Sequence, residues 1–336
     1  MAHLSKEQLA KVKKVKSKSN EEVMLKKQNV VGVGIGIKIQ GGKSTDRPAL
    51  ITFVSNKQPL KSLSEEDVVP TTIEGVETDV IEIGLPEIHI FKDENVKTKE
   101  SDQMRTLPGN ELNTKIRPVK GGWSIGHPDI TAGTVGAIVY NREESNLTKY
   151  YILSNNHVLA NSNNANIGDP ILQPGAVDGG SAPDDQVATL SRFVPIDLTP
   201  DKPLSEHENV IDAAIAEGSL QELDRDIYWS GYVRGWVEKD EVEVGAVVKK
   251  IGRTSGYTTG EILSVDATID VNFGNNRVAR FHDQILTTHM SEGGDSGSLV
   301  TDMENRAVGL LFAGSTEVTI LNQIENVRNL LEIDFV

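Results

Sequence analysis

Residues 293–300 read Gly-Gly-Asp-Ser-Gly-Ser-Leu-Val, a glycine-flanked serine that leads directly into a short apolar strand. Taken alone, this stretch has an ordinary explanation as a type I turn, because Gly, Asp and Ser are typical turn residues. It predicts more only together with two other segments, which supply an imidazole and a carboxylate.

The other two segments are short strands that carry one polar residue each. Residues 152–159 read ILSNNHVL, a strand that runs into His157, and residues 210–215 read VIDAAI, an apolar strand that contains Asp212. Singly, such a histidine is usually structural and such an aspartate usually caps a turn. Together they match what a serine hydroxyl needs to become a nucleophile: a base for its proton, and a carboxylate that fixes the tautomer of that base.

The order His157, Asp212, Ser296 resembles that of the chymotrypsin-like (trypsin-fold) serine proteases. SNNHV is similar to the TAAHC-type segment of trypsins, and more similar to the TNNHV of HtrA-type bacterial proteases. VIDAAI resembles their DLAV-type strand, and GGDSGS resembles their GDSGG. The resemblance covers residues from about 120 to 330.

A second, looser resemblance involves the stretches SIGHPDITAGTVGAIV at 124–139 and IGRTSGYTTGEI at 251–262, together with the N-terminal region. They are similar to a group of disulfide-free bacterial and plant trypsin-fold proteins, the NAL1-like group.

The resemblance implies a serine-type endopeptidase that hydrolyses peptide bonds through an acyl-enzyme. Ser296 would be the nucleophile, His157 the general base and then acid, and Asp212 the orienting carboxylate. The backbone N–H groups of Gly294 and Ser296 would form the oxyanion hole, where losing one donor costs on the order of 3 kcal/mol in related chemistry.

Two positions around the serine depart from the family pattern. Ser298 stands where a second glycine is usual. In extracellular trypsins a freshly cleaved N-terminus pairs with the acid before the nucleophile, which is Asp295 here. No IVGG-type activation site precedes Gly121, so we expect Asp295 to have another partner.

The same alignment maps part of a specificity pocket. Met290, six residues before the serine, stands where trypsins have the acid that selects Lys or Arg. Phe312, Ala313 and Gly314 align with the wall that binds substrate backbone. A thioether offers no charge to a basic side chain, so an apolar or small P1 residue is expected.

From Gly121 onward, short β-branched segments alternate with Gly, Asn, Asp and Pro, which predicts a mainly β fold. Two clusters of strands, over about 130–220 and 235–315, predict two barrels side by side, and the resemblance implies that they form a trypsin-like double β-barrel. An apolar stripe predicts a C-terminal helix over Thr319–Ile333. The expected strands are Gly133–Tyr140, Tyr150–Ser154, Val187–Pro195, Val210–Ala216, Ala246–Ile251, Gly260–Ile269, Arg277–Thr287, Gly297–Val300 and Ala307–Ala313.

The N-terminal region predicts a small α+β unit. A Lys- and Glu-rich helix is expected over residues 5–27, followed by a hairpin from VVGVGIGIKIQ to ALITFV. The glycines of this hairpin lie inside a strand, where a phosphate-binding loop would need them between strand and helix. A polar stretch near 100–118 has the composition of a linker. We therefore expect residues 1–118 to form a pro-segment or docking arm, and residues 119–336 to form the protease domain.

Composition excludes several classes of function. The chain has 34 Lys+Arg against 49 Asp+Glu, a net charge of −15, which argues against a nucleic-acid partner. The absence of cysteine excludes disulfide scaffolds, thiolate metal sites and cysteine nucleophiles. No apolar run is long enough to span a membrane, and no secretory signal is seen, so we expect a cytoplasmic protein without a membrane partner. Export by a route that uses no Sec signal is the alternative. A peptide or protein substrate is expected, and the sequence leaves open whether the chain forms a homo-oligomer.

Metal and cofactor sites are not expected. Glu206, His207 and Glu208 lack metal-ligand spacing, as do His282, Asp283 and His289, and Asp184-Asp185 has the surroundings of a turn. The alternative to an enzyme is a catalytically silent trypsin-fold scaffold that binds a peptide or protein.

Overall fold

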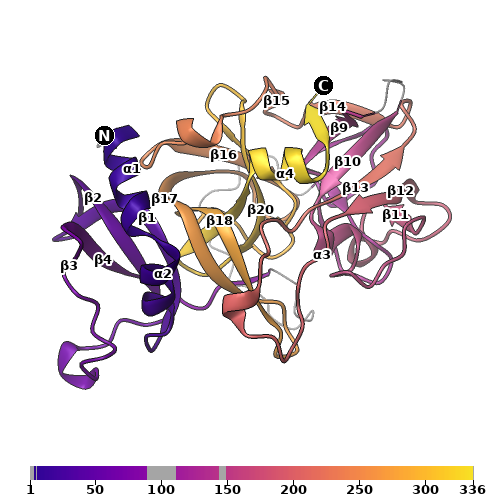
Figure 1. Cartoon of the computed structure of the whole chain (residues 1–336). Helices are drawn as coiled ribbons and strands as arrows, with labels where there is room; N and C mark the ends of the chain where they lie inside the picture. Colours follow the sequence, from indigo (N-terminus) through magenta and orange to yellow (C-terminus); the bar gives the residue numbers. More distant parts are fainter. Residues whose placement is uncertain (1–3, 5, 89–110, 144–148, 336) are drawn as a thin grey trace, which may run out of the picture.

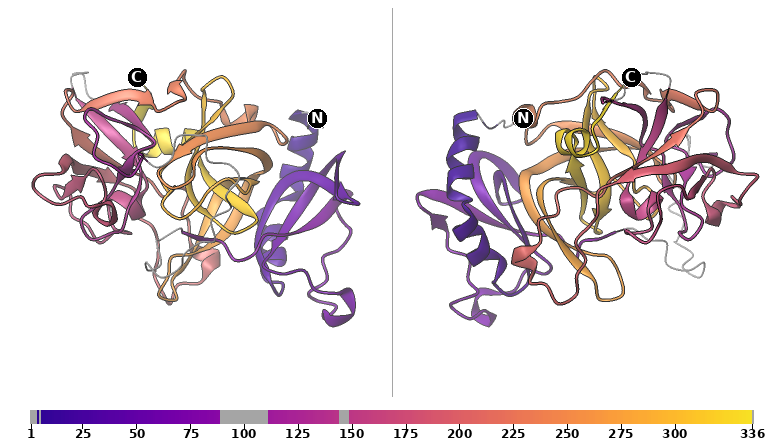
Figure 2. Two further views of the ribbon diagram at one scale, coloured as in Figure 1. Left: turned by 180° about the vertical axis from the view of Figure 1, so that it is seen from behind. Right: turned by 45° about the vertical axis from the view of Figure 1, so that its right-hand side comes forward.

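The structure is a computed structural model that describes residue 4 and residues 6–88, 111–143 and 149–335. Three parts of the chain lie in a row (Figures 1 and 2): an N-terminal unit in indigo, a central barrel in orange and yellow, and a second β unit in magenta. In the described part, no helix is both long and apolar enough to cross a membrane.

The central barrel is closed by its own hydrogen bonding. Its strands follow one another in the order β16, β19, β20, β21, β18, β17, and β16 pairs again with β17. Apolar side chains such as Val248, Ile262 and Leu311 fill it. The strands are β16 (Val247–Gly252), β17 (Gly256–Asn272), β18 (Val278–Thr288), β19 (Leu299–Asp302), β20 (Ala307–Gly314) and β21 (Val318–Gln323).

The other β unit is built on a 6-stranded sheet with the order β11-β12-β13-β10-β9-β22. Two small sheets and the short helix α3 (Asn156–Leu159) complete it. The strands of the large sheet are β9 (Ala137–Asn141), β10 (Tyr150–Ser154), β11 (Pro170–Leu172), β12 (Gln186–Phe193), β13 (Ala214–Gly218) and β22 (Ile333–Phe335). The remaining strands are β6 (Val119–Gly121), β7 (Ser124–Ile125), β8 (Gly133–Thr134), β14 (Leu223–Ile227) and β15 (Gly231–Tyr232).

The N-terminal unit is joined to the central barrel through a shared sheet. β1 (Val30–Gln40) and β2 (Lys43–Val54) form the expected hairpin, and β1 also pairs with β17. Gly34 lies at this junction, where a Cβ atom would be only 2.3 Å from Ser264 Oγ. The unit also contains β3 (Thr72–Ile73), β4 (Val76–Glu82), α1 (Lys6–Val15) and α2 (Lys18–Leu25). A two-residue strand, β5 (Glu87–Ile88), then pairs with β17 and β20.

The predicted fold class is confirmed: the chain is mainly β, with a trypsin-like pair of β units, a C-terminal helix and a small N-terminal α+β part. The linker predicted near 100–118 falls largely outside the described residues, and the division at residue 118 stays a prediction.

Two helix predictions were wrong in extent. Thr319–Gln323 belongs to β21, because this β-branched run pairs with β18 and β20 and closes the barrel. The C-terminal helix, α4, covers only Ile324–Leu330, and the Gln323 side chain caps it by accepting from the N–H groups of Glu325 and Asn326. The N-terminal helix is interrupted at Ser17, whose backbone is extended with φ −61° and ψ 156°.

Candidate active site

The imidazole of His157 lies against the carboxylate of Asp212. β10 ends at Ser154, and the following turn of helix places His157 Nδ1 2.6 Å from Asp212 Oδ2. The backbone N–H of the same histidine donates to Asp212 Oδ1 at 3.1 Å. Asp212 is fully buried and His157 is 7% exposed. The carboxylate therefore holds both the ring and the backbone of the histidine.

Both β units support Asp212 through its backbone. Asn155 Nδ2 donates to the carbonyl of Asp212 at 2.7 Å, and the N–H of Asp212 donates to Asn322 Oδ1 at 3.0 Å. The Asn322 side chain in turn donates to Gln284 Oε1 at 2.8 Å. Because Asn322 and Gln284 belong to the central barrel, Asp212 is fixed at the junction of the two β units.

Ser296 lies at the same junction, on the turn that precedes β19. Its carbonyl accepts from the N–H of Thr134 at 2.8 Å, and a Cβ atom on Gly133 would meet both this carbonyl and the side chain of Val158. The serine turn is thus packed beside α3. Ser296 Oγ donates to the Phe312 carbonyl at 3.5 Å, and among the described residues His157 Nε2 has no hydrogen-bond partner.

The loop before Ser296 has its carbonyl groups held by side chains outside the loop. Thr254 Oγ1 donates to the carbonyl of Gly293 at 2.6 Å, and Thr134 Oγ1 donates to that of Gly294 at 2.9 Å. Gly294 has φ +98°, which glycine adopts without strain. No described residue accepts from the N–H groups of Gly294 and Ser296. This geometry leaves two backbone donors uncommitted next to the serine.

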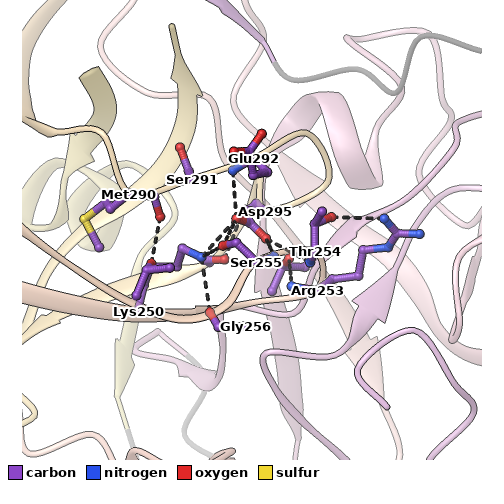
Figure 3. Close-up of polar contacts among 12 residues, drawn as sticks. Lys250, Arg253, Thr254, Ser255, Gly256, Met290, Ser291, Glu292 and Asp295 are labelled. Carbon is purple, nitrogen blue, oxygen red and sulfur yellow. Dashed lines mark hydrogen bonds and ion pairs between the residues drawn. The ribbon is translucent and has the colours of Figure 1, made fainter. Parts of the chain in front are cut away.

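Asp295 makes a fully buried ion pair with Lys250 (Figure 3). Lys250 Nζ lies 2.9 Å from Asp295 Oδ2, and both side chains have zero exposure. The same carboxylate accepts from the Ser255 side chain and from the backbone N–H groups of Thr254, Ser255 and Glu292. Burial acts to raise the pKa of Asp295, but Lys250 and the hydrogen bonds outweigh it and lower the pKa below 3.8.

The expected partner of Asp295 is Lys250, a residue that does not stand out in the sequence. The pattern that could have identified Lys250 is the period-two alternation of β16. Val248 and Lys250 share one face of this strand and are both buried, while Lys249 lies on the other face. A lysine on the apolar face of a barrel strand needs an internal counter-charge.

The residues expected to line a specificity pocket are all buried. Met290 belongs to the apolar core of the central barrel, and its sulfur lies close to Gly260. The ring of Phe312 packs on Phe281 with 4.9 Å between centroids. Ala313 and Gly314 pair with β21 on one side and with β5 on the other.

A cavity of about 480 Å³ lies away from these residues, between α1 and the central barrel, and its lining includes Leu9, Val265 and Gln323. Within the described ranges, no group of three or more His, Asp or Glu side chains is arranged to hold a metal ion.

Comparisons with known proteins give two kinds of similarity. Residues 8–86 match the family described as the NARROW LEAF 1 N-terminal domain. The chain is 24% identical over 319 residues to Protein NARROW LEAF 1 of Oryza sativa subsp. japonica, an alignment that covers 85% of this chain. It spans 51% of that relative, about half its length.

Several solved structures with a similar course of the chain are those of proteases. Thermobifida fusca protease A has 16% identity and a TM-score of 0.46, covering 65% of this chain and 98% of that one. Nocardiopsis protease has 18% identity and a TM-score of 0.45, with the same coverage. The HtrA-type protease AlgW with a decapeptide has 17% identity and a TM-score of 0.35, covering 60% of this chain and 51% of that one.

Proposed function

We propose that this chain is a serine-type endopeptidase in which Ser296, His157 and Asp212 form the catalytic triad. The observation that carries the proposal is the 2.6 Å contact between His157 Nδ1 and Asp212 Oδ2, with the opposite ring nitrogen left without a partner. A carboxylate only accepts hydrogen bonds, so Nδ1 carries the proton and the Nε2 lone pair is available as a base.

The chemistry follows from that tautomer. His157 Nε2 takes the proton of Ser296 Oγ as the oxygen attacks the peptide carbonyl, and the imidazolium is stabilised by Asp212. The oxygen that becomes negative is bound by the N–H groups of Gly294 and Ser296. Collapse of the tetrahedral intermediate expels the amine, which receives the proton from His157. Water then hydrolyses the acyl-enzyme by the same steps.

Substrate preference follows from the surroundings of the serine. Met290, Phe312 and Ala313, the residues that the resemblance aligns with a specificity pocket, are uncharged. Neutral peptide segments are therefore the proposed substrates. Gly314 would offer its backbone to a bound peptide.

A second candidate is a catalytically silent scaffold that binds peptides at the same place. It is favoured by the hydrogen bond of Ser296 Oγ, which goes to the Phe312 carbonyl at 3.5 Å and not to His157. In this reading the triad side chains are retained without turnover.

A fluorophosphonate reagent separates the two candidates. We expect covalent labelling of the full chain at Ser296, found by peptide mass spectrometry, and its loss in His157→Ala. His289→Ala is the matched control, since this histidine lies outside the triad and donates to the Ser315 carbonyl. Absence of labelling both in the unmutated chain and in a variant whose β5 is released, Ile88→Asp, would contradict the peptidase and favour the scaffold.

A further inference from the structure

The edge of β20 that faces Ser296 is occupied by three pieces of chain in succession. β19 pairs with Gly309 and Leu310. The serine turn comes next: the N–H of Gly297 donates to the Leu311 carbonyl at 2.8 Å, and Ser296 Oγ reaches the Phe312 carbonyl. β5 then pairs with Ala313 and Gly314. β5 thus continues the same edge immediately beyond the serine.

The direction of β5 is that of a peptide approaching the serine. The pairing is antiparallel, with Glu87 opposite Gly314 and Ile88 opposite Ala313. Moving from Glu87 to Ile88 therefore leads along β20 toward Phe312, the residue whose carbonyl accepts from Ser296. A peptide that adds to this edge as an antiparallel strand and presents its next carbonyl to Ser296 would use the same pairs.

β5 is anchored by its side chain as well as by its backbone. Ile88 is 4% exposed and belongs to the apolar cluster that contains Phe281, Phe312 and Val318. On the other side, the N–H of Asn272 in β17 donates to the Pro86 carbonyl at 2.9 Å. Because the isoleucine side chain is buried in an apolar cluster, this short strand is held more firmly than two backbone pairs alone would allow.

The exposure of the candidate catalytic side chains agrees with an occupied edge. Ser296 is 1% exposed and His157 is 7% exposed. While β5 pairs with Ala313 and Gly314, a substrate strand cannot pair with the same residues of this edge.

We propose that Glu87–Ile88 is an intramolecular ligand of the candidate active site, bound where the substrate backbone on the N-terminal side of the reacting carbonyl would bind. A substrate must displace β5, and an aliphatic residue is preferred at the position opposite Ala313. The regulatory consequence rests on the proposed peptidase function, whereas the binding of a peptide strand at this edge does not.

The binding test uses the full chain with Ser296→Ala, which removes any turnover. The probe is a fluorescent peptide with the sequence of residues 82–88, Glu-Ile-Gly-Leu-Pro-Glu-Ile. Ile88→Asp places a charge in the apolar cluster and should release β5. Leu85→Asp is the matched control, because it makes the same change three residues earlier at a side chain that is 70% exposed.

We expect anisotropy measurements to give at least ten-fold tighter peptide binding to the Ile88→Asp chain than to the parent or the Leu85→Asp control. Equal affinities, or no binding to the Ile88→Asp chain, would overturn the proposal. Where Ile88→Asp lacks a cooperative thermal unfolding transition, Ile88→Ala takes its place under the same criteria.

The catalytic consequence is tested with Ser296 intact. A peptidyl fluorophosphonate, which needs the β20 edge, should label Ile88→Asp at least ten-fold faster than the parent. A small alkyl fluorophosphonate should discriminate less between them. Tighter peptide binding without labelling of any variant would contradict the proposed peptidase and leave the docking of β5 standing. Equal labelling by the peptidyl reagent would count against the occupied edge.

Discussion

Lys250 and Asp295 form an ion pair with 2.9 Å between Nζ and Oδ2 and with no solvent exposure on either side chain. Asp295 lies between Gly294 and Ser296, whose N–H groups are the proposed oxyanion donors. Breaking this pair leaves a buried carboxylate without a counter-charge, which costs about 3–5 kcal/mol. Lys250→Met, which keeps the length of the side chain, should lower the free energy of unfolding by that amount.

The same variant should label with fluorophosphonate at least ten-fold more slowly, because the loop that carries the donors loses its anchor. Lys249→Met is the matched control, since this neighbouring lysine points away from the barrel core. Urea unfolding and labelling rates measure the two effects. Equal stability of the two variants would contradict the structural role of the pair.

The Lys250–Asp295 pair also predicts an alkaline limit on activity. Burial lowers the pKa of Lys250 below its ordinary 10.5, although the neighbouring carboxylate acts in the opposite direction. Between the lowered pKa and 10.5 the unfolded chain binds more protons than the folded one, so this group makes the free energy of unfolding rise with pH. The ion pair itself is lost in this window. The labelling rate should therefore begin to decline at a pH lower than 10.5, as the ion pair is lost.

Lys250→Arg tests this limit, because a guanidinium keeps its charge throughout the range. A folded Lys250→Arg chain should move the alkaline fall of the labelling rate to higher pH. An unchanged profile would show that another group sets the limit. On the acid side the pKa of Asp295 is lowered, so its contribution to stability is present above 3.8 and disappears as pH falls through the folded-state pKa.

Asp212→Asn should reduce turnover of a peptide substrate by about 10⁴-fold, because an amide can donate to Nδ1 and stabilise the wrong tautomer of His157. Peptide hydrolysis at saturating substrate is the measurement. The control is Asp197→Asn. The Asp197 carboxylate accepts from Lys202 Nζ and from the N–H of Thr199, and the Lys202 ammonium lowers the pKa of Asp197 to about 2. Similar losses in both variants would argue against an orienting role for Asp212.

The segments that could be predicted from the sequence are those whose pattern is contained within a few consecutive residues. The strand before His157 and the glycine-flanked Ser296 each carry their pattern within six residues. The strand expected over Val210–Ala216 begins only at Ala214, so Asp212 lies in the segment that leads into β13 and not in the strand itself. Strand alternation likewise gave the β1–β2 hairpin. Thr319–Gln323 was assigned to a helix because apolar residues recur there at helical spacing, and only pairing with β18 and β20 decides for a strand.

What could not be predicted depends on contacts between distant segments. Glu87–Ile88 is too short to show any periodicity, and its place on β20 comes from pairing with Ala313 and Gly314. Lys250 is one of two adjacent lysines. Its role as the counter-charge of Asp295 depends on the packing of β16 beside the loop that carries Ser296. Thr254 belongs to the same class, since its target is the carbonyl of Gly293.

Thr254→Val should slow turnover by about ten-fold, less than the loss of a whole oxyanion donor. The Thr254 hydroxyl donates to the Gly293 carbonyl at 2.6 Å and so fixes the peptide group whose N–H belongs to Gly294. The effect should lie in kcat, with KM changed less than two-fold, because the donor acts on the transition state. Thr254→Ser keeps the hydroxyl and should restore at least half of the rate. A fall in Thr254→Ser as large as in Thr254→Val would assign the loss to packing.

Gly34→Ala should destabilise the attachment of the N-terminal unit to the central barrel. The added Cβ atom would lie 2.3 Å from Ser264 Oγ and 3.0 Å from Ala267 Cβ, on the strand β17 that pairs with β1. Overpacking of this kind costs about 1–3 kcal/mol. Ser264→Ala removes the nearest atom, so the double variant should recover part of the loss, beyond the sum of the single effects. Urea unfolding of the four chains measures the coupling. Strict additivity would mean that β1 and β17 are not in close contact at Gly34, and that the N-terminal unit is held by α1 and α2 instead.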